Sequence, residues 1–384
     1  MTAMPAMIGR YAIERVLGSG GMGEVYLAFS PAGDPVAIKL IRADQLDPTT
    51  RARFEKEAKI AATVVGTNRV ARFLEAAPYA DRPWLAMEYI PGRTLQAHVD
   101  AEGPLPTALT ASLGALLGEG LQAVHAAKLL HRDLKPQNVI MGEHGPILID
   151  FGLGAFIGKA KDSLSNSGMI IGTARCMSPE QASGNPHVST AADVYGLGVL
   201  LLFASTGHFP YEGASWQAIV AQVSAPAFTP DLDGLPADLH PLVSSMLHHT
   251  PESRPTLDEV FDACKQLMLD ASLTPAQVRH LLIDRTSPRH LGESLIAVPS
   301  ESALKRIEEQ ARVEAAASGD DGPDSSAQDE DELSSQDEAS SESPAPEPDA
   351  TPSNGAAAPR RGRPAASQRI ADDLRRRYAA NPSL

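Results

Sequence analysis

The segment His131–Asn138, which reads HRDLKPQN, restricts what this chain can be more than any other feature of its sequence. It carries an acid, Asp133, followed at fixed spacing by a lysine, Lys135, and by the amide of Asn138. A short way along the chain, Asp150 stands at the end of an apolar run and is followed by Phe-Gly. Two acids, a lysine and an amide at such spacing are hard to obtain by chance, so they predict a catalytic centre.

A glycine-rich segment, Gly18–Gly23 (GSGGMG), lies near the start of the chain. Dinucleotide-binding folds share this GxGxxG pattern, but they need a helix directly after the last glycine. Here the residues Glu24–Ala28 alternate as in a strand. We therefore expect a hairpin whose backbone N–H groups lie over phosphates, with Val25 beneath an adenine. A plain hairpin turn is the alternative.

Lys39 lies inside the apolar run VAIK, and a strand period of two puts Ala37 on the same face. A buried ammonium group needs an anion, and Glu57 is the candidate. Residues 50–63 are rich in helix formers, and helical spacing turns Glu57 inward together with Phe54. The alternative is a lysine on an edge strand that points into water.

The remaining pattern predicts two regions of different character. Short β-branched runs dominate the first, and apolar residues at helical spacing dominate the second. The sequence thus indicates an α+β protein with a β-rich first lobe that contains one helix, followed by a mainly helical lobe. The expected strands are Tyr11–Leu17, Glu24–Ala28, Pro35–Leu40 and Trp84–Ile90, and the expected helices are 50–63, 107–127, 190–206, 215–223 and 256–269.

The motifs GxGxxGxV, VAIK, HRDLKPxN and DFG, in this order, resemble those of the protein kinase superfamily over residues 8–269. The resemblance is in particular to the eukaryotic-like serine/threonine kinases of bacteria. It implies the two-lobed kinase fold, with an N-lobe at 8–90, a C-lobe at 91–269 and a helical extension at 270–317. The implied activity is transfer of the ATP γ-phosphate to Ser/Thr hydroxyls of proteins, with Mg²⁺ as the metal. The implied targets include the chain itself, through autophosphorylation.

Two other functions remain open beside this one. A pseudokinase scaffold is the first, and the presence of Lys39, Asp133 and Asp150 disfavours it. A small-molecule phosphotransferase of related fold is the second. The segment Gly172–Glu180 resembles the platform on which kinases hold a peptide, which speaks against this alternative.

The roles of the family's residues carry over to matching positions of this chain. The resemblance implies that Lys39 holds the α/β-phosphates and pairs with Glu57, while Asp133, with Lys135 beside it, orients the substrate hydroxyl and accepts its proton. Asn138 and Asp150 would hold the magnesium ions. The resemblance also implies a set of residues that line the nucleotide, for which an ordinary core or turn role is the alternative. These lining residues are Leu17, Gly18, Ser19, Gly20, Gly21, Met22, Gly23, Val25, Ala37, Met87, Glu88, Ile90 and Ile140.

The segment that ends at Glu180 departs from the family pattern, with Cys176 where Tyr is usual. The resemblance further implies a buried Asp193 that bonds the catalytic loop and an ion pair between Arg254 and Glu180. Arg132, beside the catalytic acid, predicts regulation by phosphorylation of the 150–180 segment. The candidate regulatory residues are Ser163, Ser165 and Ser167, together with Thr173, for which a structural contact with Asp133 is the favoured role.

The net charge of −15 is unevenly distributed. Residues 318–358 contain twelve Asp/Glu and no Lys or Arg, and we expect them to form a disordered linker. Residues 359–384 carry seven Arg against two Asp, and a short helix there would bind a partner. The acidic balance argues against nucleic-acid binding, and no apolar run is long enough to span a membrane, so we expect a cytoplasmic protein. Two cysteines exclude a disulfide framework.

Overall fold

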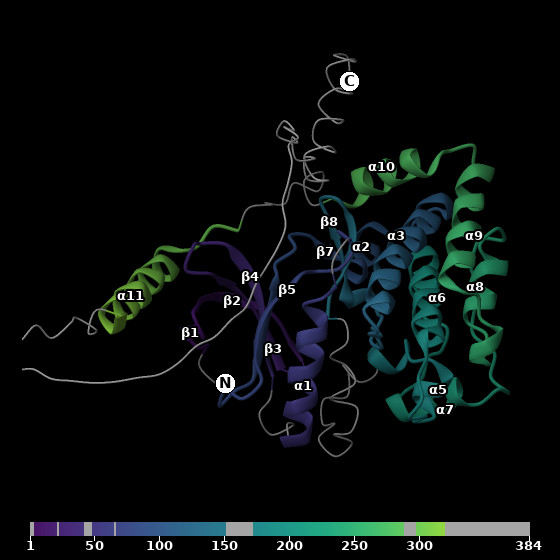
Figure 1. Ribbon diagram of the computed structural model, residues 1–384. Helices are drawn as coiled ribbons and strands as arrows, with labels where there is room; N and C mark the ends of the chain where they lie inside the picture. The colour runs from purple at the N-terminus through teal and green to yellow at the C-terminus, as the bar shows by residue number, and fades with distance from the viewer. Residues whose placement is uncertain are drawn as a thin grey trace, which may run out of the picture. The chain divides into compact units, whose positions relative to one another are not determined.

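The computed structural model describes residues 4–20, 23–41, 48–64, 67–150, 172–287 and 297–318, and Figure 1 shows their helices and strands. All of them belong to one unit of the chain, Met1–Gly322. The predictions for the acidic and basic C-terminal segments lie almost entirely outside the described residues. So do those for Gly21, Met22, Ser163, Ser165 and Ser167.

The first lobe is a six-stranded antiparallel sheet with the strand order β1-β2-β3-β4-β6-β5. The glycine-rich segment joins two strands and not a strand and a helix, as the alternation after Gly23 predicts. The four predicted strands are confirmed, whereas β1 and β5 were not predicted. The elements are β1 (Met7–Ile8), β2 (Tyr11–Gly20), β3 (Gly23–Phe29), β4 (Pro35–Ile41), α1 (Pro48–Ala61), β5 (Phe73–Ala77) and β6 (Trp84–Glu88).

Strand β4 distributes its side chains between the two faces of the sheet with a period of two. Its residues Val36, Ile38 and Leu40 pack into one apolar cluster, on the face that also carries Tyr11 and Trp84. The alternate residues Ala37 and Ile41 pack with Phe54 of α1 in a second cluster. Lys39 has the same parity as this second set and is 8% exposed. Because β4 pairs with a strand on each side, Lys39 is not an edge-strand lysine.

The second lobe is mainly helical and contains one small antiparallel sheet, β7-β8-β9. The four helices predicted for this lobe are confirmed as α3, α6, α7 and α9. The elements are β7 (Arg93–Thr94), α2 (Leu95–Glu102), α3 (Thr107–Ala126), β8 (Val139–Gly142), β9 (Gly145–Leu148), α5 (Pro179–Ala182), α6 (Thr190–Thr206), α7 (Trp216–Ser224), α8 (His240–Met246) and α9 (Leu257–Asp270), followed by α10 (Pro275–Thr286) and α11 (Glu301–Ser318). No helix in the described ranges is both long and apolar enough to cross a membrane.

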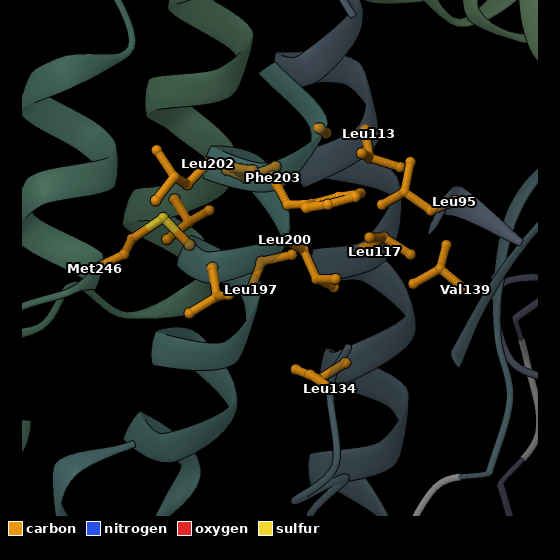
Figure 2. Close-up of a cluster of buried hydrophobic side chains, with 14 of the residues drawn as sticks. Leu95, Leu113, Leu117, Leu134, Val139, Leu197, Leu200, Leu202, Phe203 and Met246 are labelled. Carbon is orange, nitrogen blue, oxygen red and sulfur yellow. The ribbon is translucent and has the colours of Figure 1, made fainter. Parts of the chain in front are cut away.

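The core of the second lobe forms where α3 and α6 pack together (Figure 2). Leu113 and Leu117 of α3 meet Leu200 and Phe203 of α6 in this cluster. Helix α6 buries residues on all of its sides, which is the pattern of a central helix. Leu134, the residue after the predicted catalytic acid, is 3% exposed and belongs to the same cluster. The core therefore anchors the loop that carries Asp133.

The chain between α1 and β5 also packs into the second lobe. Val70 is a member of the α3–α6 core and forms a parallel bridge with Leu148 at the end of β9. On either side of it, Ala71 N donates to Leu148 O at 2.8 Å, and Leu148 N donates to Arg69 O at 2.7 Å. These bonds tie the strand that leads to Asp150 to a segment of the first lobe's own chain.

Gly23 occupies a position that no other residue can fill without strain. Its φ of +144° is rarely adopted by L-residues, and a Cβ there would lie 1.9 Å from the carbonyl oxygen of Leu40. We expect Gly23→Ala to lower the free energy of unfolding by about 2 kcal/mol or more, because strain and backbone overlap add. Gly18→Ala is the matched control, since a Cβ at that position would meet no atom within 4 Å. Equal denaturant midpoints for both variants would contradict this prediction.

Candidate active site

The loop that begins at His131 is held in place by the buried carboxylate of Asp193, on α6. Asp193 accepts hydrogen bonds from the backbone N–H groups of His131 at 2.9 Å and Arg132 at 2.8 Å. His125, at the end of α3, donates to the same carboxylate at 2.7 Å. Burial by itself raises the pKa of Asp193, but these bonds outweigh it and the pKa is lowered. The predicted bonding of the catalytic loop by a buried Asp193 is thus confirmed.

The imidazole of His131 connects this loop to the strand that leads to Asp150. His131 is fully buried, and its Nε2 lies 3.1 Å from the carbonyl oxygen of Ile149. Burial lowers the pKa of His131, so the ring is neutral and Nε2 carries the proton that it donates to this carbonyl. One residue before Asp150, the chain is therefore fixed to the catalytic loop.

Asp133 has one carboxylate oxygen engaged and one available. Its Oδ2 accepts from Lys135 Nζ at 2.6 Å and from Asn138 Nδ2 at 3.0 Å. Its Oδ1 is buried and has no hydrogen-bond partner among the described residues. A buried acceptor without a partner is costly, which makes this oxygen suited to a donor brought by a substrate. The geometry fits the role that the sequence predicts for Asp133.

Lys135 connects Asp133 to the start of the next described segment. Burial lowers the pKa of Lys135, but Asp133 outweighs this effect, so the pKa is raised and the amine is protonated. Besides its bond to Asp133, Lys135 Nζ donates to Thr173 Oγ1 at 3.3 Å. The contact predicted between Thr173 and Asp133 therefore runs through Lys135 and is not direct. The hydroxyl of Thr173 thus accepts a hydrogen bond from a charged lysine.

Lys39 and Asp150 meet across the two lobes, although 111 positions separate them in the sequence. Lys39 Nζ donates to Asp150 Oδ2 at 2.8 Å, and the two side chains are 10% and 18% exposed. Burial raises the pKa of Asp150, but Lys39 outweighs this effect and the pKa is lowered. The predicted partner Glu57 lies on α1, but its side chain is outside what the structure describes. The buried ammonium of Lys39 thus has a carboxylate partner in Asp150.

Several of the predicted nucleotide-lining residues come together on the inner face of the sheet. Ala37 and Met87 are buried in one cluster, and Val25 packs against it. Ile140, on β8, is half-buried and comes from the other lobe. Leu17 is 37% exposed and is not a member of this cluster in the described part of the chain. The other predicted lining residues with a described position lie on the strands or directly after them: Gly18, Ser19 and Gly20 on β2, Gly23 on β3, Glu88 at the end of β6 and Ile90 beyond it.

The side chains available for a metal ion are Asn138 and Asp150. The side chain of Asn138 makes both of its described hydrogen bonds through Nδ2, which donates to the backbone oxygen and to the carboxylate of Asp133. Its amide oxygen is thus left as a ligand atom. Within the described ranges, no group of three or more His, Cys, Asp or Glu side chains could hold a metal ion. A set of one carboxylate and one amide suits a cation that takes its remaining ligands from phosphates and water.

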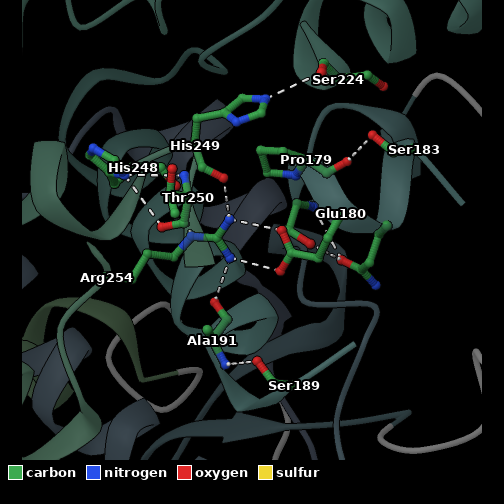
Figure 3. Close-up of polar contacts among 12 residues, drawn as sticks. Pro179, Glu180, Ser183, Ser189, Ala191, Ser224, His248, His249, Thr250 and Arg254 are labelled. Carbon is green, nitrogen blue, oxygen red and sulfur yellow. Dashed lines mark hydrogen bonds and ion pairs between the residues drawn. The ribbon is translucent and has the colours of Figure 1, made fainter. Parts of the chain in front are cut away.

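The ion pair between Arg254 and Glu180 is confirmed and is almost completely buried (Figure 3). The guanidinium binds the Glu180 carboxylate through two bonds of 2.8 Å each. The remaining N–H groups of Arg254 donate to the carbonyl oxygens of Ala191, His248 and His249. All five donors are therefore used. This pair fixes α5 to the start of α6 and to the loop that follows α8.

Two residues of this region were missed by sequence reasoning, His125 and Gln181. Gln181 Nε2 donates to the carbonyl oxygen of Arg132 at 2.9 Å and so links α5 to the catalytic loop. Its position was readable, because Ser178 and Gln181 form a capping box with the S-x-x-Q pattern. His125 gave no comparable signal, since a histidine near a helix C-terminus is satisfied by many partners.

Residues 11–264 match the family model described as "Protein kinase domain". The chain belongs to the protein kinase family. The probable serine/threonine-protein kinase PkwA of Thermomonospora curvata is 43% identical to this kinase over 67% of the chain and 34% of that protein. The serine/threonine-protein kinase AfsK of Streptomyces griseus is 37% identical over 79% of the chain and 35% of that protein. The chain thus spans about a third of the length of these relatives.

Comparison with solved structures agrees on the fold. The kinase domain of Mycobacterium tuberculosis PknI superposes on this kinase with a TM-score of 0.55 and covers 69% of this chain and 100% of that one. Its sequence is 24% identical. The β-rich first lobe and the helical second lobe are therefore the N-lobe and C-lobe of the protein kinase fold. The helix α11 lies beyond the residues that match the family model.

Proposed function

We propose that this protein is a serine/threonine kinase, which transfers the γ-phosphate of ATP to hydroxyl groups of proteins. The observation that carries the proposal is the arrangement of Asp133. One of its oxygens is held by Lys135 and Asn138, while the other is buried and has no partner in the described part of the chain. A fixed carboxylate with a free oxygen can receive a hydroxyl group, which is what phosphoryl transfer to Ser or Thr requires.

ATP and a divalent cation fit the residues that are present, and we propose Mg²⁺ as the cation. Magnesium binds hard oxygen ligands, commonly one or two from the protein, with phosphates and water completing its coordination. Asp150 and the amide oxygen of Asn138 would supply these two ligands. Lys39, held beside Asp150, would bind phosphate oxygens. When bound, the nucleotide would supply the phosphoryl group, and the metal would neutralise part of its charge.

The chain's own residues would do the remaining work. Asp133 Oδ1 would accept the hydrogen bond of the substrate hydroxyl, orient it and take its proton. Lys135, protonated and 2.6 Å from the other oxygen of Asp133, would place a positive charge beside the group in transfer. The neutral His131 and the carboxylate of Asp193 would hold the loop rigid, so that positioning costs little at the moment of reaction.

The preference for Ser and Thr is supported by Lys135 and by the names of the relatives, which are serine/threonine-protein kinases. The platform Gly172–Glu180 supports a protein substrate, since α5 and the Arg254–Glu180 pair hold its end. The regulatory role of Ser163, Ser165, Ser167 and Thr173, the partner of the basic C-terminal segment and a cytoplasmic location remain predictions.

Transfer of radiolabelled phosphate from ATP to a mixture of general protein substrates tests the proposal. We expect labelling by the wild type and at least about a 10²-fold loss in Lys39→Met, because a lysine that binds phosphate acts on transition-state charge. Lys265→Met, at an exposed position of α9, is the matched control and should keep wild-type activity. A wild type that binds ATP but labels no protein would instead favour the pseudokinase scaffold.

A further inference from the structure

In the described part of the chain, two helices follow the segment that matches the kinase family, and they contact different lobes (Figure 1). Helix α10 packs on α3, α9, β8 and β9, and it buries Val278 and Leu282 in the core of the C-lobe. Helix α11 packs on β2 of the N-lobe. Strand β2 leads directly into the glycine-rich segment. The later helix therefore contacts the strand that would cover the nucleotide.

The contact between α11 and β2 has an apolar centre with polar bonds on both sides. Ala303 is fully buried against Ala12 and Phe29, which are themselves fully buried. At the start of the helix, the backbone N–H and the hydroxyl of Ser300 donate to Glu14 Oε2 at 3.1 and 2.8 Å. One turn into the helix, the guanidinium of Arg306 donates to the carbonyl oxygen of Ile13.

These polar bonds coincide with an irregularity in β2. In the pairing with β3, Ile13 is opposite Ala28 and Arg15 is opposite Leu27, which leaves Glu14 without a cross-strand partner. This is the pattern of a β-bulge, in which the extra residue bends the strand and changes its direction. A second shift follows between Val16 and Gly18. The direction in which β2 enters the glycine-rich segment thus depends on how the residue Glu14 is held.

The bonds from α11 fix this bulge from outside the sheet. Glu14 has no partner in the β2–β3 register, and it is the side-chain carboxylate of Glu14 that is held, by the two bonds from Ser300. The backbone N–H of Ile13 donates to Ala6 O, and the carbonyl oxygen of Ile13 accepts a hydrogen bond from Arg306. Buried and half-buried positions recur on α11 at helical spacing, whereas Glu308 and Glu309 are exposed. The residues turned toward the sheet are Ala303, Arg306, Ile307 and Gln310.

We propose that α11 is a positioning element for nucleotide binding, in which Ser300 and Arg306 hold the bulge at Glu14 and thereby orient the glycine-rich end of β2. The inference rests on the proposed binding of ATP. Ser300 and Arg306 are positioning residues, since they act through the strand and do not touch the reacting groups. Release of α11 should weaken ATP binding while the chemistry on Asp133 and Asp150 stays intact.

The test compares full-length Arg306→Ala and Ser300→Ala with the wild type. Glu309→Ala, on the exposed side of the same helix, is the matched control. We measure kcat, the KM for ATP and the KM for a protein substrate, together with the Kd of a non-hydrolysable ATP analogue by calorimetry. The KM and Kd for nucleotide should rise about three- to tenfold, the effect expected when one or two ordering hydrogen bonds are lost. The kcat at saturating ATP and the KM for protein should stay within about twofold.

A double variant, Glu14→Ala with Ser300→Ala, adds an internal check. If the two residues act through one contact, the double variant should weaken nucleotide binding no more than the stronger single variant. Variants that keep the wild-type unfolding temperature and the wild-type Kd would overturn the inference, as would a fall in kcat with nucleotide affinity unchanged. A wild type that binds no nucleotide would overturn the proposed function and this inference together.

Discussion

Asp150→Asn should lower the rate of phosphoryl transfer at least about 10²-fold, equivalent to about 2.7 kcal/mol of transition-state stabilisation. The carboxylate of Asp150 lies 2.8 Å from Lys39 Nζ and would bind the metal through its charge. Asparagine keeps the shape of the side chain and removes that charge. The measurement is single-turnover transfer of labelled phosphate at saturating ATP, so that a change in affinity does not obscure the chemical step.

Asparagine is also the right replacement for the backbone at this position. Asp150 has a φ of +60°, a left-handed conformation that asparagine tolerates better than alanine does. Asp150→Asn should therefore fold with nearly the stability of the wild type, whereas Asp150→Ala adds backbone strain to the loss of charge. Asp262→Asn, at an exposed position on α9, serves as the control. Retention of more than about a tenth of wild-type transfer in Asp150→Asn would rule out the assigned role.

Arg254→Met should lower the free energy of unfolding by about 3–5 kcal/mol, the largest stability effect that we expect from one substitution in this kinase. The side chain of Arg254 is fully buried and that of Glu180 is 7% exposed. Removal of the guanidinium leaves the Glu180 carboxylate buried without its counter-ion, together with three carbonyl oxygens that lose a donor. Denaturant unfolding of Arg254→Met, with the exposed Arg285→Met as control, measures this loss.

A second substitution separates the cost of an unpaired charge from the value of the pair. In Arg254→Met with Glu180→Leu, both charges are gone, and the double variant should be more stable than Arg254→Met alone.

The ion pair between Arg254 and Glu180 also predicts how stability depends on pH. Burial raises the pKa of Glu180, but Arg254 outweighs this and the pKa is lowered. The ionised Glu180 therefore stabilises the fold fully above about pH 4.3, the ordinary pKa of Glu. This stabilisation is lost as the pH falls through the lowered pKa that Glu180 has in the folded protein. If the loss in Arg254→Met is below about 1 kcal/mol, the pair is not a stability determinant.

The elements of the kinase domain were largely predictable, because their signals are local. The alternation on either side of Lys39 gave the correct strand and face, and the apolar periodicity of α3 and α6 gave helices close to their observed bounds. The motifs also singled out Asp133, Asn138 and Asp150, and the structure places Asn138 Nδ2 3.0 Å from the carboxylate of Asp133. Their catalytic and metal-binding roles stay predictions. In each of these cases, residues near in sequence determine the outcome.

Contacts between segments that are distant in the sequence were harder to predict. The pairing of Lys39 with Asp150 was not predicted, because the closing of two lobes is decided by packing that no local pattern encodes. The predicted pairing of Lys39 with Glu57 stays a prediction. The position of α11 was equally hidden. A helical extension at 270–317 was expected, but an interface centred on Ala303 carries too weak an apolar signal to identify β2 as its partner. Bulges such as that at Glu14 leave no mark in a single sequence.

The two places where the chain passes between the lobes lie side by side. The first is the segment Arg69–Ala71, bonded to Leu148, and the second follows Glu88, whose N–H donates to Arg72 O at 2.8 Å. Together they form one corner at which backbone hydrogen bonds join the two lobes. Strand β4 is next to β6 in the sheet order, and β2 is two strands further away. A rotation of the sheet about this corner would therefore move the glycine-rich end of β2 further than it moves Lys39 on β4.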